Sequence, residues 1–314
     1  MKILVVGAGA IGGYFGGRLL NAGRDVTFLV RPRRAAELAK TGLAVRSRLG
    51  DVDIPAPTTV SAEALRGGFD LIILSCKAYD LRAAADSFAP AVGPDTAILP
   101  LLNGIGHLDT LTARFGESRV LGGLCMISTT LDADGRILHL NDLHALAFGE
   151  RDGALSARAQ AIAQTMAGAG FDMRPTTAIL QEMWEKWVFI AAGAGITCLM
   201  RATVGDIVAA GATDLTLALI EECAAIAGAQ GFPPGEAAMA RSRTMFTAPG
   251  SAMAASMLRD VERGGPTEAD HVLGDLLRRG EEKGVRAPLL AVAYAHLKSY
   301  EARRAREIAA KQAA

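Results

Sequence analysis

The first half of the chain alternates short apolar runs with segments of helical periodicity. The apolar runs lie at residues 3–6, 25–30, 71–76, 97–103 and 120–128. Runs that are apolar throughout are typical of strands covered on both faces, and strands that alternate with helices predict βαβ units in a parallel sheet. We expect the segment at 139–153 to add a final strand pair.

After about residue 175 the pattern changes to long segments rich in Ala, Leu, Glu and Arg. Their periodicity predicts helices near 178–201, 213–230, 252–263, 267–284 and 288–309. The expected fold is therefore an α/β N-terminal domain with a Rossmann-type parallel sheet, residues 1–174, followed by an all-α C-terminal domain, residues 175–314.

Composition excludes several classes of function. The 314 residues are half hydrophobic, and 33 basic and 33 acidic side chains balance to a formal charge of zero. No global field attracts nucleic acid or an anionic membrane. The apolar stretch at 187–200 is shorter than the roughly 20 residues of a bilayer span, and the N-terminus lacks the apolar core of a signal peptide. We expect a cytoplasmic protein, with a homodimer left open.

The cysteines and histidines predict no metal site. Four cysteines lie far apart without a CxxC pair, and five histidines lack the spacing of metal ligands: Cys76, Cys125, Cys198, Cys223, His107, His139, His144, His271 and His296. Reduced thiols are the expectation. His107 follows an apolar strand and could reach a cleft, but we expect it to be a solvated loop residue.

A glycine-rich turn follows the first apolar run. Gly7, Gly9 and Gly12, with Ala8, Ala10 and Ile11 between them, form a GxGxxG that opens a helical segment. Glycines at these positions permit a tight turn and a close approach to a pyrophosphate, and the helix N-terminus attracts its charge. The sequence predicts a dinucleotide site here. A tight turn without a ligand is the alternative.

Arginines follow the second strand. Sites that prefer NAD usually carry an acidic residue at this point, whereas this chain has Arg31, Pro32, Arg33 and Arg34. A guanidinium suits the 2′-phosphate of NADP. We therefore expect Arg31 to bind NADP(H), although arginines that only solvate a loop would look the same.

Lys77 and Asn103 end two later strands. Ligands in open α/β sheets bind beyond the carboxyl ends of strands, so both side chains could face the nicotinamide half of the cofactor. Lys and Asn also end strands for solubility and turn formation.

Several motifs, taken in order, resemble those of the ketopantoate reductase family. They are GAGAIGG, the Arg31 position, SCKAYD, LLNGIGH, WEKW and SMLRDVERGGPTEAD, and they span the chain from residue 1 to about 300. The resemblance implies a reductase that converts 2-dehydropantoate, a 2-oxo acid, to pantoate with NADPH in pantothenate biosynthesis. It also implies that the helical domain completes the active site.

The resemblance assigns roles to single residues. Lys186 matches the catalytic lysine that donates a proton to the substrate oxygen, and Glu268 matches the acidic residue that contacts cofactor and substrate. Ser256 matches the serine that binds the substrate carboxylate. Lys77 and Asn103 match the pair near the nicotinamide, and Asn103 with Lys186 also contacts substrate.

Simpler interpretations of these residues remain open. Lys186 could be an exposed lysine paired with Glu182, one turn earlier. Thr267 and Asp270, on either side of Glu268, also fit an ordinary helix start.

The chain departs from the family at four positions. Ile190, Ala194, Met253 and, by a less secure match, Val204 stand where the family has asparagines. The substrate site should therefore be more apolar than a pantoate-forming one. Two alternatives follow: a reductase of a different, more apolar 2-oxo acid, and a non-catalytic NADP-binding sensor. A third is a different dehydrogenase of the same two-domain architecture, acting on a phosphorylated or amino substrate.

Overall fold

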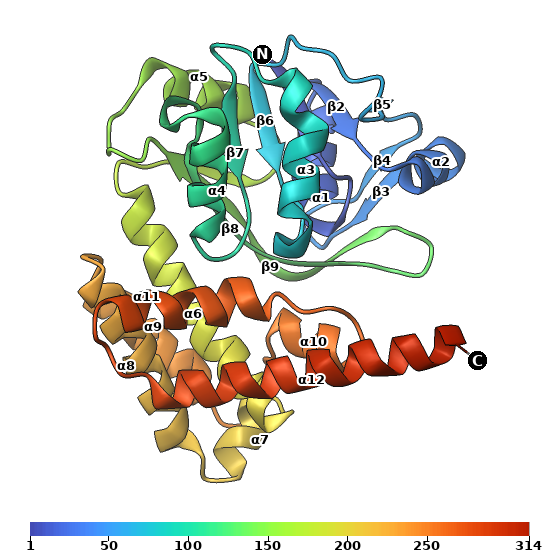
Figure 1. The fold of residues 1–314 in the computed structure, drawn as a ribbon. Coiled ribbons are helices and arrows are strands. Elements are labelled where there is room, and N and C mark those ends of the chain that lie inside the picture. Colours follow the sequence, from blue (N-terminus) through green and yellow to red (C-terminus); the bar gives the residue numbers. More distant parts are fainter. Residues whose placement is uncertain (314) are drawn as a thin grey trace. The chain divides into compact units, whose positions relative to one another are not determined.

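The computed structural model describes residues 1–313, which form two compact units. The first unit comprises residues 1–102 and 107–180, and the second comprises residues 103–106 and the chain from residue 181 onward. Figure 1 shows strands and helices in the first unit, while helices build the second. None of the described helices combines the length and apolarity needed to cross a bilayer.

A parallel sheet forms the centre of the first unit. Its order is β5-β2-β1-β6-β7, and every neighbouring pair is parallel. The bounds are Lys2–Val6 for β1, Asp25–Leu29 for β2, Thr59–Val60 for β5, Leu71–Leu74 for β6 and Ala97–Pro100 for β7. Four of the five apolar runs are thus confirmed as strands of one parallel sheet.

A second, mixed sheet was not expected. It contains β3 (Leu43–Arg46), β4 (Val52–Ile54), β8 (Gly122–Leu131), β9 (Ile137–Gly149) and β10 (Asp172–Pro175). The run at 120–128 forms an isolated parallel bridge to the parallel sheet, between Val120 and Ile98, and from Gly122 onward pairs antiparallel with β9. Instead of the expected strand pair, residues 139–149 form most of one long strand, β9, and residues 150–153 lie beyond its end.

Helix α1 (Ala10–Asn21) packs against strands of both sheets through glycines on two faces. A Cβ added at Gly16 would lie 2.6 Å from the Phe28 ring on β2, so this face meets the parallel sheet. A Cβ added at Gly17 would lie 2.8 Å from Leu43 on β3, so the other face meets the mixed sheet. Small residues are what allow the two sheets to approach one helix so closely.

The remaining helices of the first unit are short. They are α2 (Pro32–Thr41), α3 (Leu81–Phe88), α4 (Gly106–Phe115) and α5 (Ala157–Met166), with single turns η1 (Ala78–Asp80), η2 (Ala89–Ala91) and η3 (Glu117–Arg119). In Figure 1, α3 and α4 cover one face of the parallel sheet, opposite to α1.

The second unit contains more helices than the sequence predicts. They are α6 (Ile179–Met200), α7 (Val204–Ala209), α8 (Thr213–Ala229), α9 (Glu236–Phe246), α10 (Ser256–Glu262), η4 (Asp270–Gly274), α11 (Asp275–Glu282) and α12 (Pro288–Ala313). Those predicted near 178–201, 213–230 and 288–309 are confirmed. The one at 252–263 begins only at Ser256, and the one at 267–284 is a π-helical turn followed by α11. The short helices α7 and α9 were not predicted.

Candidate functional site

The glycine turn lies directly after β1, at the carboxyl edge of the parallel sheet. Gly7 has a φ of +94°, and its N–H donates to the Leu29 carbonyl at 2.9 Å. Helix α1 begins at Ala10 with Gly9 as its N-cap, where no described side chain caps the free N–H groups. A Cβ added at Gly7 or Gly9 would meet nothing within 4 Å. The open space beside uncapped N–H donors fits a pyrophosphate.

Gly12 has a different role from the two glycines before it. A Cβ at this position would lie 2.2 Å from both the Gly7 carbonyl oxygen and the Ser75 Oγ. Ser75 in turn donates to the Val6 carbonyl at 3.2 Å. Gly12 is therefore required for helix α1 to pack against the turn and against the end of β6.

The three arginines after β2 differ in what they contact. Arg34 Nε donates to the Ala8 carbonyl of the glycine turn at 3.0 Å, and the same guanidinium contacts Gly135 and Glu37. Arg33 Nε lies 3.6 Å from a Glu37 oxygen. Arg31 is the N-cap residue of α2, and its side chain is 74% exposed. Arg34 thus braces the turn, while the Arg31 side chain is mostly exposed and contacts Asp80.

Lys77 and Asn103 are both partly buried, and they belong to different compact units. Lys77 precedes η1 after β6 in the first unit, whereas Asn103 groups with the helical unit. The His271 imidazole forms a hydrogen bond with the Asn103 backbone, and burial lowers the pKa of His271. Gly104 has a φ of +73°, and a Cβ there would lie 3.1 Å from the His271 carbonyl. The NGIG segment is therefore packed on η4.

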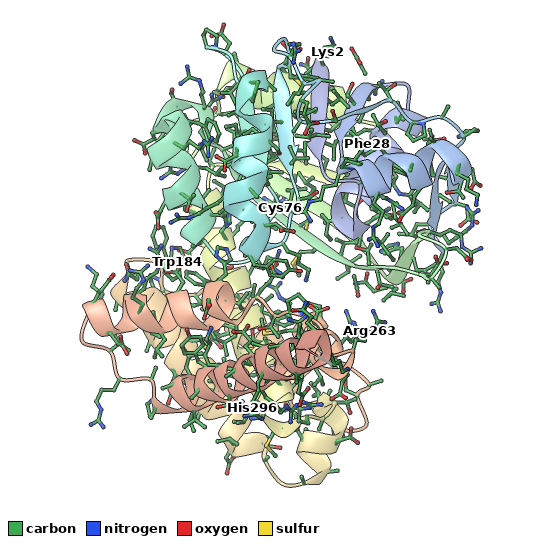
Figure 2. All side chains as sticks on the ribbon, turned by 45° about the vertical axis from the view of Figure 1, so that its right-hand side comes forward. Lys2, Phe28, Cys76, Trp184, Arg263 and His296 are labelled. Atoms are coloured by element: carbon green, nitrogen blue, oxygen red, sulfur yellow. The ribbon has the colours of Figure 1, made fainter. Side chains whose placement is uncertain are left out.

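The WEKW segment lies in the first half of α6, where Lys186 is partly buried between aromatic neighbours. The rings of Trp184 and Trp187 have centroids 4.9 Å apart, and Trp184, labelled in Figure 2, stacks on Phe232 at 5.7 Å. Trp187 Nε1 donates to the Val272 carbonyl at 2.8 Å. These contacts fix the helix turn that carries Lys186.

Glu268 is partly buried and lies two residues before η4. Its carbonyl accepts hydrogen bonds from the backbone N–H groups of His271 at 3.1 Å and Val272 at 2.9 Å. Because Val272 also binds Trp187, one hydrogen bond links the segment of Glu268 to the helix of Lys186. A π-helical turn at this point is a common feature of functional sites.

The residues flanking Glu268 lie at a helix start, as the simpler interpretation predicts, but their side chains also contact α12. Thr267 Oγ1 accepts from the Ala269 N–H at 3.3 Å and donates to Glu301. Asp270 instead accepts from the Tyr294 hydroxyl at 2.6 Å and from Lys298. Both flanking side chains therefore anchor η4 to α12.

Ser256 is the exposed first residue of α10. The preceding residue, Ala255, donates its N–H to Thr197 Oγ1 of α6 at 3.4 Å. Thr197 lies three helical turns after Lys186, so the start of α10 is tied to the helix that carries the candidate catalytic lysine.

The four positions that lack the family's asparagines fall into two pairs. Ile190 and Ala194 occupy the first and second turns after Lys186 on α6, and Ala194 is buried. The N–H of Val204 donates to the Met253 carbonyl at 2.9 Å, so the residues of the second pair are in contact.

The thiols and imidazoles form no metal cluster. Among the described residues, no group of three His, Cys, Asp or Glu side chains could hold an ion. The four cysteines are thiols rather than disulfides, and burial raises the pKa of Cys198 to about 12. Cys76, labelled in Figure 2, follows β6. The expectation for His107 was wrong, because its side chain is fully buried in the first turn of α4.

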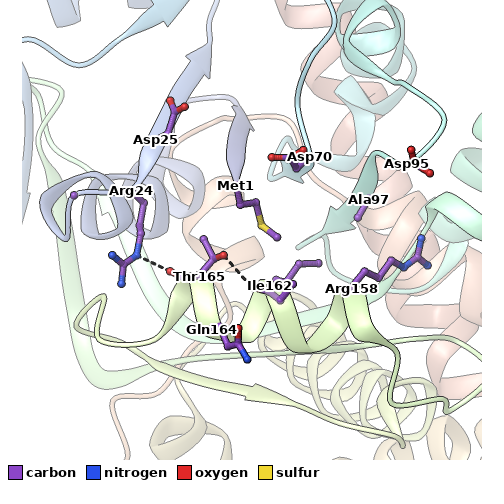
Figure 3. A pocket seen from close by; sticks show the side chains of 12 residues that line it. Met1, Arg24, Asp25, Asp70, Asp95, Ala97, Arg158, Ile162, Gln164 and Thr165 are labelled. Carbon is purple, nitrogen blue, oxygen red and sulfur yellow. Dashed lines mark hydrogen bonds between the residues drawn. The ribbon is translucent and has the colours of Figure 1, made fainter.

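Figure 3 shows a hollow at the amino edge of the parallel sheet, between the strand starts and α5. Its arginines are engaged within the protein. Arg24 donates to the carbonyls of Thr165 at 2.6 Å and Ala167 at 2.8 Å, and Arg158 pairs with Glu150 at 2.6 Å. Because dinucleotides bind at the carboxyl edge, this hollow is not the candidate cofactor site.

Comparison with known families matches both parts of the chain. The family model described as ketopantoate reductase PanE/ApbA matches residues 3–153, and the model for the C-terminal part of the same family matches residues 178–301.

Individual proteins match over nearly their whole length. An uncharacterized oxidoreductase of Bacillus subtilis (strain 168), YkpB, is 40% identical over 96% of this chain and 99% of its own. A 2-dehydropantoate 2-reductase of Mesorhizobium japonicum is 29% identical over 89% of this chain and 91% of its own. The crystal structure of 2-dehydropantoate 2-reductase from Methylococcus capsulatus superposes with a TM-score of 0.86 at 30% identity, covering 97% of this chain and 98% of that one.

Proposed function

The chain belongs to the ketopantoate reductase family of oxidoreductases, and on that premise we propose that it reduces a 2-oxo acid to a 2-hydroxy acid with NADPH. The substrate we propose first is 2-dehydropantoate or a close analogue. The observation that carries the proposal is the hydrogen bond from Trp187 to Val272, because it joins the helix of Lys186 to the segment of Glu268.

Lys186 is the proposed acid. A bound reduced nicotinamide supplies a hydride to the keto carbon, so negative charge develops on the substrate oxygen. An ammonium beside that oxygen stabilises the charge and then delivers the proton. The packed tryptophans hold the Lys186 turn in place, which lowers the cost of orienting the group.

The other residues bind and orient. We assign Glu268 to contacts with substrate and cofactor, and Ser256 to the substrate carboxylate. Asn103 and Lys77 are assigned to the nicotinamide end, Asn103 also touching substrate. The turn from Gly7 to Gly12 is assigned to the pyrophosphate, because its N–H donors are uncapped and the space beside it is open.

Replacing Arg31 with aspartate should weaken NADPH binding much more than NADH binding. The guanidinium extends from the end of β2, where the 2′-phosphate is expected, and NADH lacks that group. Dissociation constants of both nucleotides, measured by calorimetry, test the assignment. Equal losses for the two cofactors would show that Arg31 does not bind the 2′-phosphate.

A more apolar 2-oxo acid is the second candidate substrate. Ile190 and Ala194 place aliphatic groups on the two turns after Lys186, and Met253 and Val204 are likewise unable to donate side-chain hydrogen bonds. A hydroxyl placed against such a surface loses its partners in water without replacement. Branched 2-oxo acids without the 4-hydroxyl would not incur this loss of hydrogen bonds.

Replacing Ile190 with asparagine should shift the preference toward 2-dehydropantoate. The amide adds a hydrogen bond for the 4-hydroxyl, worth about 1 kcal/mol or roughly fivefold in kcat/KM. The measurement is the ratio of kcat/KM for 2-dehydropantoate and for 3,3-dimethyl-2-oxobutanoate, which differ only by this hydroxyl. Ile190→Val is the matched control, and a ratio that moves equally in both variants contradicts the prediction.

The function is tested by NADPH oxidation with a panel of 2-oxo acids, with the 2-hydroxy acid product identified. Turnover of at least one member that is lost in Lys186→Ala supports the proposal. NADPH binding without turnover of any member would favour the non-catalytic sensor.

A further inference from the structure

An ion pair joins two loops at the carboxyl edge of the parallel sheet. One terminal nitrogen of Arg31 lies 2.8 Å from Asp80 Oδ1. Arg31 follows β2 and Asp80 closes η1 after β6, and these two strands flank β1 in the sheet. The pair therefore spans the strand from which the glycine turn emerges.

This pair is poorly suited to a structural role. The side chain of Arg31 is 74% exposed and that of Asp80 is 34% exposed. Ion pairs so open to water contribute little to stability. Arg34, by contrast, is 16% exposed and binds two backbone carbonyls. The fold uses Arg34 as its brace and leaves Arg31 able to turn toward a ligand.

Asp80 presents a carboxylate where a 2′-phosphate would have to approach Arg31. A dianionic phosphate on that guanidinium would repel the carboxylate already beside it. The ribose 2′-hydroxyl of NADH meets no such repulsion, and acidic residues accept hydrogen bonds from it in sites that use NAD. No acidic residue at the end of β2 could accept a hydrogen bond from the ribose hydroxyls. Asp80, on the loop after β6, contacts the Arg31 guanidinium and could supply that acceptor.

We propose that Asp80 sets the cofactor preference, by competing with the 2′-phosphate for Arg31 and by offering an acceptor to the ribose hydroxyls of NADH. The chain would then use both nicotinamide nucleotides, with a smaller preference for NADPH than Arg31 alone would give. This inference rests on the proposed function, because it assumes that the glycine turn holds a nicotinamide dinucleotide.

The experiment measures binding, without turnover. Calorimetry with adenosine 2′,5′-bisphosphate and with 5′-AMP isolates the contribution of the 2′-phosphate, and NADPH and NADH are then compared in the same way. In Asp80→Asn we expect the bisphosphate to bind about fivefold more tightly, from removal of one like charge near the phosphate, and 5′-AMP to bind no more tightly. The gain should shrink as salt is raised.

Asp86→Asn is the matched control. Asp86 lies within α3, the helix that begins directly after Asp80, and its side chain is 69% exposed and pairs with Arg114. The substitution removes the same charge from the same part of the fold without affecting Arg31. The ratio of the affinities for adenosine 2′,5′-bisphosphate and 5′-AMP should therefore stay within about twofold of the wild-type value.

The outcomes separate this inference from the function beneath it. Suppose that the wild-type protein binds both NADPH and NADH. If Asp80→Asn leaves the ratio of the two affinities unchanged, or if Asp86→Asn changes it equally, Asp80 does not set the cofactor preference, and the reductase proposal is unaffected. A wild-type protein that binds neither dinucleotide overturns both.

Discussion

Replacing Lys186 with alanine is expected to lower kcat/KM for the 2-oxo acid by about 10² to 10⁴-fold, while NADPH affinity barely changes. The ammonium stabilises negative charge that develops only as the carbonyl is reduced. Its removal therefore raises the free energy of the transition state and leaves cofactor binding nearly unchanged. Steady-state kinetics and calorimetric NADPH binding on the same preparation measure both quantities.

A second lysine provides the control for that experiment. Lys283 is exposed at the end of α11, and Lys283→Ala removes an equal charge from the helical unit without touching α6. Its kcat/KM should stay within about twofold of wild type. A Lys186→Ala enzyme with nearly normal turnover would instead favour the simpler interpretation, in which Lys186 only pairs with Glu182.

Gly9→Ala is expected to abolish most cofactor binding in a protein that remains folded. The backbone at Gly9 has φ −85° and ψ −162°, which alanine adopts readily, and the new methyl group would meet no protein atom within 4 Å. The methyl instead occupies space that the pyrophosphate needs. We expect NADPH affinity to fall at least about tenfold, or roughly 1.4 kcal/mol, with a change in Tm of only a few degrees.

Gly12→Ala makes an informative contrast. Its Cβ would lie 2.2 Å from a backbone oxygen and from Ser75 Oγ, so the variant should lose stability by about 1–3 kcal/mol or more as well as cofactor binding. Thermal unfolding and NADPH binding, measured on both variants, separate the two roles. If Gly9→Ala lowered Tm as much as Gly12→Ala, its effect on the cofactor could not be assigned to the phosphate space.

Four strands of the parallel sheet could be predicted because they read as largely buried, continuous apolar runs, whereas the two-residue edge strand β5 carries no such signal. The second sheet could not, since its short strands β3, β4 and β10 include partly exposed positions and form no continuous apolar run. The run at 120–128 looked like one more parallel strand. An apolar run is compatible with either sheet. The hydrophobic pattern therefore does not reveal that Val120 forms only an isolated bridge to Ile98 before the strand pairs with β9.

The site was predicted unevenly for a similar reason. The glycine turn and Arg31 lie close together in sequence beside their strands, so local pattern was enough to find them. Lys186 and Glu268 entered through family resemblance, because neither stands out from an ordinary helix in its own segment. Asp80 was missed as a partner of Arg31, since only the strand order β2-β1-β6 brings the two loops together.

The glycines of α1 also bear on how the protein folds. Each glycine inside a helix costs roughly 1 kcal/mol relative to alanine, and α1 carries four of them between Gly12 and Gly17. Such a segment has little tendency to be helical by itself, so its helical form depends on contacts from Phe28 on one side and Leu43 on the other. The shape of the cofactor turn therefore depends on the strands that pack against α1, and a truncated side chain at Phe28 or Leu43 would disturb the nucleotide site from a distance.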